Sequence, residues 1–74
     1  MNTLFYKIVF ESQEEGGFTV YAPKLPGCVS EGETYDEAYQ NIRDALELYV
    51  TTLKERNIEI GYDDTHISEI GIPI

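Results

Sequence analysis

The sequence is poor in residues that provide covalent or metal-based stability. Its 74 residues include one cysteine and one histidine. A single cysteine excludes an internal disulfide bond, and one histidine beside one cysteine gives no cluster of metal ligands. A domain of this size buries only about 60% of its unfolded surface, and small domains often add stability by association. We therefore predict oligomers, and we predict no metal ion or other cofactor.

Long apolar runs are absent as well. No stretch approaches the roughly 18 apolar residues of a membrane-spanning helix. The N-terminus lacks the basic segment and the apolar core of a signal peptide. We expect a soluble, cytoplasmic protein without membrane contact.

Positive charge is scarce. Five basic residues face fourteen acidic ones, for a formal net charge of −9. Such a surface repels phosphate backbones, because nucleic-acid binding depends on Lys and Arg displacing counterions; we expect no direct nucleic-acid binding. The same field would speed association with a basic protein. The alternative is that the acidity only keeps a small protein in solution.

Three strands are predicted in the first half of the chain. Residues 4–11 are rich in β-branched and aromatic side chains, and residues 18–22 alternate with the period of a strand. The polar residues 12–17 end in two glycines and indicate a hairpin loop. Pro26 and Gly27 occupy the central positions of a type II turn, which leads into a third strand over residues 28–31.

One long helix should follow. Thr34 and Glu37 have the spacing of a capping box, in which each side chain accepts a backbone N–H bond near the helix start. The apolar period then changes to three and four over residues 35–56, and Asn57 suits a left-handed residue at the helix end. The apolar stripe of this predicted helix comprises Ala38, Ile42, Ala45, Leu46, Tyr49 and Leu53.

A final strand is predicted over residues 66–72, where apolar residues alternate imperfectly, with Pro73 blunting the sheet edge. The order is then β-β-β-α-β. It predicts one α+β domain over residues 1–74, an antiparallel meander with one helix on one face.

These residues resemble the HicB-like antitoxin family in an ordered series that covers most of residues 4–53. The fragments are Glu15-Gly16-Gly17-Phe18-Thr19-Val20, Pro23-x-Leu25-Pro26-Gly27-Cys28, Glu31-Gly32-Glu33-Thr34-x-x-Glu37-Ala38, Asn41-Ile42-x-x-Ala45 and Leu48-Tyr49. The resemblance implies a partial RNase H-like fold, a homodimer or homotetramer, and inhibition of a HicA toxin, a small basic ribonuclease that cleaves mRNA.

The sequence departs from this family in two respects. Many members carry a C-terminal DNA-binding domain, and too few residues follow the predicted helix here for one. An active RNase H site also needs several carboxylates around two metal ions, one of them in the middle of the first strand. The first strand here has Lys7 at its middle and its acid, Glu11, at its end. We therefore expect the fold without catalysis.

Candidate binding residues fall into two sets. The candidates for toxin binding are Pro26, Gly27, Glu31, Glu33 and Asp36. The acids among them could instead bind a divalent cation, or serve only the helix start and solvation. The candidates for contact between copies are Phe5, Val9 and Tyr21, because one helix cannot cover both faces of an apolar sheet. Cys28 is expected to be a packed thiol rather than a reactive one, and His66 has no catalytic partner at a recognisable spacing.

The function predicted on these grounds is a non-enzymatic antitoxin that binds and occludes a HicA-type ribonuclease. Two alternatives remain open. One is an oligomeric binding module with another partner, and the other is a metal-dependent nuclease or hydrolase that uses the acidic residues.

Overall fold

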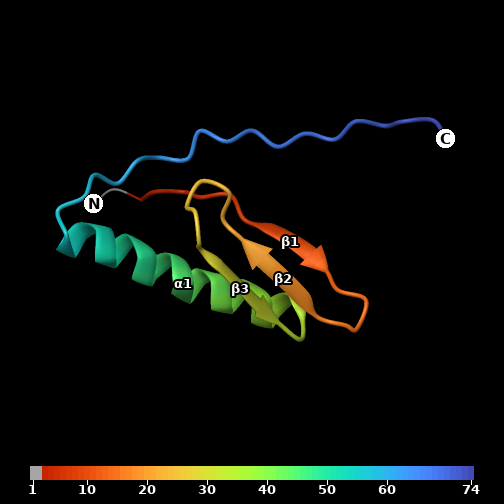
Figure 1. The fold of residues 1–74 in the computed structure, drawn as a ribbon, viewed down its shortest axis with the longest axis horizontal. Helices are drawn as coiled ribbons and strands as arrows, with labels where there is room; N and C mark the ends of the chain where they lie inside the picture. The colour runs from red at the N-terminus through yellow and green to blue at the C-terminus, as the bar shows by residue number, and fades with distance from the viewer. Residues whose placement is uncertain (1–2) are drawn as a thin grey trace.

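The fold is α+β: three antiparallel strands followed by one helix. The computed structural model describes residues 3–74. Strands β1 (Val9–Ser12), β2 (Phe18–Tyr21) and β3 (Val29–Gly32) form a sheet in the order β1-β2-β3, and helix α1 (Tyr35–Glu55) crosses one face of it (Figure 1). The predicted meander, helix and chain order are confirmed up to the end of α1.

The register of the sheet decides which side chains meet the helix. Phe10 of β1 lies opposite Val20 of β2, which lies opposite Ser30 of β3. Val20 is fully buried and Phe10 packs against the same core, so this row faces α1. Because side chains alternate along a strand, the neighbouring row faces away from the helix.

The connection from β2 to β3 is the predicted tight turn. The N–H of Cys28 donates to the carbonyl of Leu25 at 3.0 Å, and Gly27 has φ 83°. That positive φ is the reason for glycine at the third position of a type II turn. Cys28 then returns to the sheet, where its carbonyl accepts from the N–H of Ala22.

The junction between β3 and α1 is short and close-packed. The Thr34 hydroxyl accepts from the N–H of Glu37 at 3.1 Å, and the Glu37 carboxylate accepts from the N–H of Glu33 at 3.1 Å. This confirms the predicted capping box. Gly32 lies directly against the first helical turn: a Cβ there would come within 2.8 Å of the Cα of Ala38. At the other end, Asn57 has φ 57°, as predicted for the residue after the helix.

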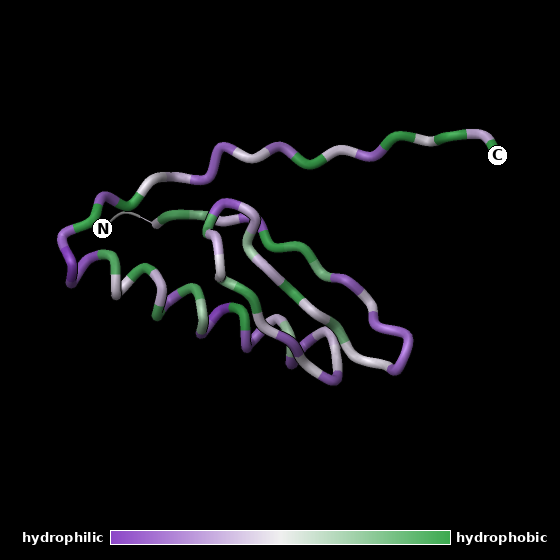
Figure 2. The backbone as a smooth tube through the Cα atoms, in the orientation of Figure 1, coloured by the Kyte–Doolittle hydropathy of each residue, from purple (hydrophilic) through white to green (hydrophobic). Residues whose placement is uncertain are grey.

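The core lies between α1 and strands β2 and β3. Ala38 and Ile42 are the buried residues of α1, and Ala45, Leu46 and Tyr49 pack beside them, which confirms the predicted stripe as far as Tyr49; its last residue, Leu53, borders a surface groove instead. Figure 2 shows hydrophobic and hydrophilic residues alternating at short intervals along the helix. The buried core comprises Val20, Ala22, Leu25, Cys28, Ala38 and Ile42.

The predicted final strand is not formed. Residues 58–74 are extended and belong to no strand of the described chain, and they run past the sheet on the β1 side without joining it (Figure 1). The first strand also begins at Val9 rather than at residue 4. Both predictions failed for one reason: alternation shows that a segment can pair, whereas a strand exists only where a neighbouring backbone accepts and donates its hydrogen bonds.

Over residues 3–74, no helix is both long and apolar enough to cross a membrane.

The buried position of Ile42 gives a direct test of the helix face. Ile42→Ala should lower the free energy of unfolding by roughly 2–5 kcal/mol, because it opens a cavity in the core. Leu48 is 68% exposed, so the control Leu48→Ala should change it by about 0.5 kcal/mol or less. Urea denaturation of both variants at one protein concentration measures this. Equal losses would show that the assigned face is wrong.

Gly32 tests the close approach of β3 to α1. Gly32→Ala places a Cβ against the backbone of Glu37 and Ala38, which cannot move without shifting the helix, so we expect a loss of about 1–3 kcal/mol in unfolding free energy. Gly61 is a matched control, because a Cβ there meets no atom within 4 Å. Thermal denaturation of Gly32→Ala and Gly61→Ala should therefore separate them clearly. Indistinguishable melting temperatures would contradict the close packing.

Candidate protein-binding surfaces

The sheet face that α1 leaves open carries an apolar row. Val9, Tyr21 and Val29 lie opposite one another across the three strands. Val9 and Tyr21 are half-buried, Val29 is exposed, and the side chain of Phe5, just before β1, is largely exposed. The structure therefore places two of the three residues predicted for contact between copies, Val9 and Tyr21, in one continuous row.

An acidic row lies next to it on the same face. Glu11, Thr19 and Glu31 face one another across the strands, two positions along from the apolar row. Two residues of a strand span about 7 Å, so side chains of the two rows are neighbours. Glu31, a predicted toxin-binding residue, thus lies beside residues that the sequence assigned to a different partner.

A concavity of about 230 Å³ at this end of the sheet gathers more carboxylates. Glu15, Glu31, Glu33 and Glu37 line it, together with the glycine-rich hairpin loop. Its shape is held by hydrogen bonds between side chains and backbone: the side-chain amide of Asn41 donates to the carbonyl of Glu31 at 2.7 Å, and the N–H of Glu33 donates to the Glu37 carboxylate. We call these four residues the acidic end.

Glu15 was missing from the sequence-based candidates. It belongs to the loop between β1 and β2, sixteen positions before Glu31. The signal was present in the topology, because in a meander the first hairpin loop lies at the same end of the sheet as the exit of the third strand. The predicted strand order therefore places Glu15 and Glu31 at the same end of the sheet, and the structure shows that they line one concavity.

The other toxin-binding candidates lie elsewhere. Asp36 is exposed in the first turn of α1 but does not line the concavity. Pro26 and Gly27 are at the opposite end of β3, where the Tyr49 hydroxyl donates to the carbonyl of Pro26 at 3.2 Å. Gly27 borders a second, mostly apolar groove of about 440 Å³ with Leu48 and Leu53. The predicted set is therefore divided between two ends of the molecule.

No metal centre or reactive thiol emerges from the described residues. Within residues 3–74, no group of three or more His, Cys, Asp or Glu side chains is placed to hold a metal ion. Cys28 is buried, and that burial raises the pKa of its thiol, which disfavours the nucleophilic thiolate. His66 is exposed in the extended C-terminal segment.

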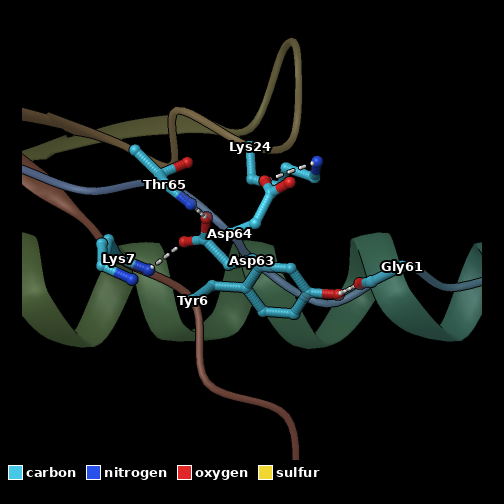
Figure 3. Close-up of polar contacts among 7 residues, drawn as sticks. All are labelled: Tyr6, Lys7, Lys24, Gly61, Asp63, Asp64 and Thr65. Carbon is cyan, nitrogen blue, oxygen red and sulfur yellow. Dashed lines mark hydrogen bonds and ion pairs between the residues drawn. The ribbon is translucent and has the colours of Figure 1, made fainter.

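That segment is fastened to the sheet by a polar cluster that the sequence did not reveal. Asp63 accepts from the backbone N–H of Lys7 at 2.7 Å and from that of Thr65 at 2.8 Å. The Tyr6 hydroxyl donates to the carbonyl of Gly61, and Asp64 pairs with Lys24 at 3.0 Å (Figure 3). We call these contacts the anchor, because they connect the segment to the residues just before β1 and to the turn after β2.

The contacts of the anchor shift the pKa values of its carboxylates. Hydrogen bonds from the Thr65 side chain, and from the backbone of Lys7 and Thr65, lower the pKa of Asp63 from 3.8 to about 2. The bond from Lys24 likewise lowers the pKa of Asp64, and the same pair raises the pKa of Lys24. All three shifts favour the charged forms that make the contacts.

Comparison with known proteins identifies the family of this chain. A family model described as "HicB_like antitoxin of bacterial toxin-antitoxin system" matches residues 6–71. The chain belongs to the HicB-like antitoxin family. The match extends beyond α1 and includes the anchor. Members of this family are typically non-enzymatic.

Similar proteins come from bacteria and archaea. A UPF0150 protein of Synechocystis is 34% identical over 67 residues, covering 90% of this chain and 85% of the relative. A UPF0150 protein of Thermoplasma acidophilum is 37% identical over 59 residues, covering 80% and 86%. One from Archaeoglobus fulgidus is 38% identical over 56 residues, covering 76% and 78%. No solved structure matches the chain at a comparable significance.

The low pKa of Asp63 predicts how acid releases the anchor. Because the folded pKa lies below the unfolded one, the charged carboxylate stabilises the anchor above about pH 4, and this contribution is lost as the pH falls toward 2. In an NMR titration, the amide signals of Lys7 and Thr65 should shift with a midpoint near 2.

In the variant Asp63→Asn, the pH-dependent shifts of the Lys7 and Thr65 amide signals should disappear. The amide of Ile42, buried in the core, reports whether the body of the protein unfolds over the same range. A midpoint at the ordinary value of 3.8 would show that the Asp63 contacts do not persist in solution.

Proposed function

We propose that this HicB-like chain is an antitoxin that binds a basic HicA-type ribonuclease and occludes its RNA-binding surface. The observation that carries the proposal is the membership of the HicB-like antitoxin family, matched over residues 6–71. The formal net charge of −9 suits a basic partner. The surface that we assign to this partner is the open sheet face with the acidic end.

The two rows on this face would act at different stages of binding. The acidic row and the acidic end attract a basic protein over a distance of about one Debye length, so they raise the association rate. Exposed charge pairs add little to the final affinity. The apolar row of Val9, Tyr21 and Val29 would therefore supply the contact area that slows dissociation.

Occlusion follows from charge. A ribonuclease holds RNA with basic side chains that contact phosphates. Carboxylates at the acidic end would pair with these basic side chains in place of RNA phosphates. RNA and antitoxin would then compete for one surface of the ribonuclease. This mechanism requires no chemistry from the antitoxin.

The experiment compares two charge-reversal variants that remove the same amount of negative charge. Glu31→Lys with Glu33→Lys alters the acidic end. Glu47→Lys with Glu55→Lys alters two exposed acids in the middle and at the end of α1. Stopped-flow association with the HicA-type toxin of the same genome, at several salt concentrations, measures each rate. Rescue of growth in cells that express the toxin measures the function.

The acidic-end variant should associate at least about tenfold more slowly than the control, and with a weaker salt dependence, because the control changes only the net charge. Circular dichroism should show both variants folded, since these side chains are exposed. Equal rates would remove the acidic end from the interface. Failure of the unaltered chain to bind the toxin would refute the antitoxin function itself.

A further inference from the structure

The last nine residues of the chain, 66–74, form an arm without a partner. Its backbone makes no hydrogen bond to the rest of the described chain, residues 3–74. Ile70 and Ile72 are 83% and 71% exposed and Ile74 is fully exposed, and in an extended chain these three share one side. The arm is thus an amphipathic extended segment whose backbone lacks hydrogen-bond partners in the described chain and whose apolar side is exposed.

The dimensions of the molecule show that the arm leaves its own domain. The radius of gyration is 14.4 Å, and the longest extent is 48 Å against 21 Å for the shortest. A compact chain of this length has a radius of about 11 Å. Figure 1 shows the arm continuing beyond the sheet, away from the anchor.

A second unsatisfied feature is the outer edge of β1. The bond from the N–H of Ala22 to Cys28 shows that even-numbered residues of β2 point their backbone groups toward β3. Alternation then directs Thr19 and Tyr21 toward β1, where they lie opposite Glu11 and Val9. The backbone groups of Phe10 and Ser12 consequently point outward, and within the described chain β1 has no neighbour on that side.

An exposed aromatic row borders this edge on the helix side. Phe10 stacks on Tyr35 with ring centroids 4.2 Å apart, and Tyr35 stacks on Tyr39 at 6.5 Å. Tyr35 and Tyr39 are 51% and 48% exposed although they lie next to the core. A strand added to the outer edge of β1 would direct alternate side chains over these rings.

We infer that two copies of this chain exchange arms, each arm adding a strand to the outer edge of β1 in the other copy. Nine extended residues span about 30 Å, enough to cover Ile8 to Ser12. Ile70, Ile72 and Ile74 would cover the aromatic row, and Glu69 and Gly71 would face solvent. Pro73, which has no N–H, would make the new edge a poor site for a further strand.

The anchor explains why the partner is a second copy. It holds residues 61–65 against Tyr6, Lys7 and Lys24, so the base of the arm belongs to its own domain while the arm itself extends away. Exchange of identical elements is reciprocal: both arms and both edges are satisfied by one two-fold axis. The open sheet face stays free, so this dimer is compatible with toxin binding but does not depend on it.

The first experiment measures mass by light scattering at tens of micromolar protein, without any toxin. The unaltered chain should be a dimer. Ile70→Ser with Ile72→Ser should raise the dimer dissociation constant by roughly a hundredfold, because each isoleucine buries its side chain on docking. The control Phe5→Ser with Val29→Ser changes the open sheet face and should leave the dimer intact. A monomeric unaltered chain, or a dimer broken only by the control, would overturn the inference.

The second experiment separates exchange from docking of the arm on its own domain. A nitroxide is attached to Glu69→Cys in a Cys28→Ala background. This tagged chain, at natural isotope abundance, is mixed with untagged chain enriched in ¹⁵N. Exchange predicts broadening of the amide signals from Ile8 to Ser12 in the untagged chain. Absence of this broadening in the untagged chain, or broadening centred on Val29, would overturn it. Matching spectra of Cys28→Ala and the unaltered chain confirm that the background folds.

Discussion

The close contact between β3 and the first turn of α1 is the constraint on which the rest of this structure depends. Gly32 allows the strand to approach the backbone of Ala38, and Thr34 and Glu37 close the helix start within two residues of the strand end. So short a connection fixes the direction of the helix, which packs against the sheet to which β3 belongs. Burial of Ile42 and Val20 follows from this placement.

One helix covers one face of the sheet, and the candidate binding surfaces are those that remain uncovered. The open face carries an apolar row beside an acidic row, the acidic end collects carboxylates from a loop, a strand and a helix, and β1 keeps an unpaired edge. In an isolated domain of 74 residues, each of these features is exposed surface or an unpaired strand edge that adds no stability. In the two proposals made above, the acids would bind a basic protein and the edge would pair with a second copy.

Local sequence patterns were enough to predict each feature that depends on residues close together in the sequence. The Pro26–Gly27 turn, the capping box and the apolar stripe of α1 each involve residues a few positions apart, whose geometry the backbone itself restricts. The division of the toxin-binding candidates was not predictable in this way. Pro26 and Glu31 are close in sequence, but an extended strand separates them, and Glu15 joins Glu31 only through the pairing of strands.

What the sequence alone determined is therefore the identity and order of the elements up to the end of α1, the face that α1 buries and the membership of the HicB-like family. The tertiary structure decided which surfaces stay open, the gathering of four glutamates and the fate of residues 58–74. Alternating isoleucines show that this segment can form a strand, but Asp63 and Asp64 hold its base to Lys7 and Lys24, which are 56 and 40 positions away. Contacts over such distances depend on where the whole chain has folded, and no local pattern encodes them.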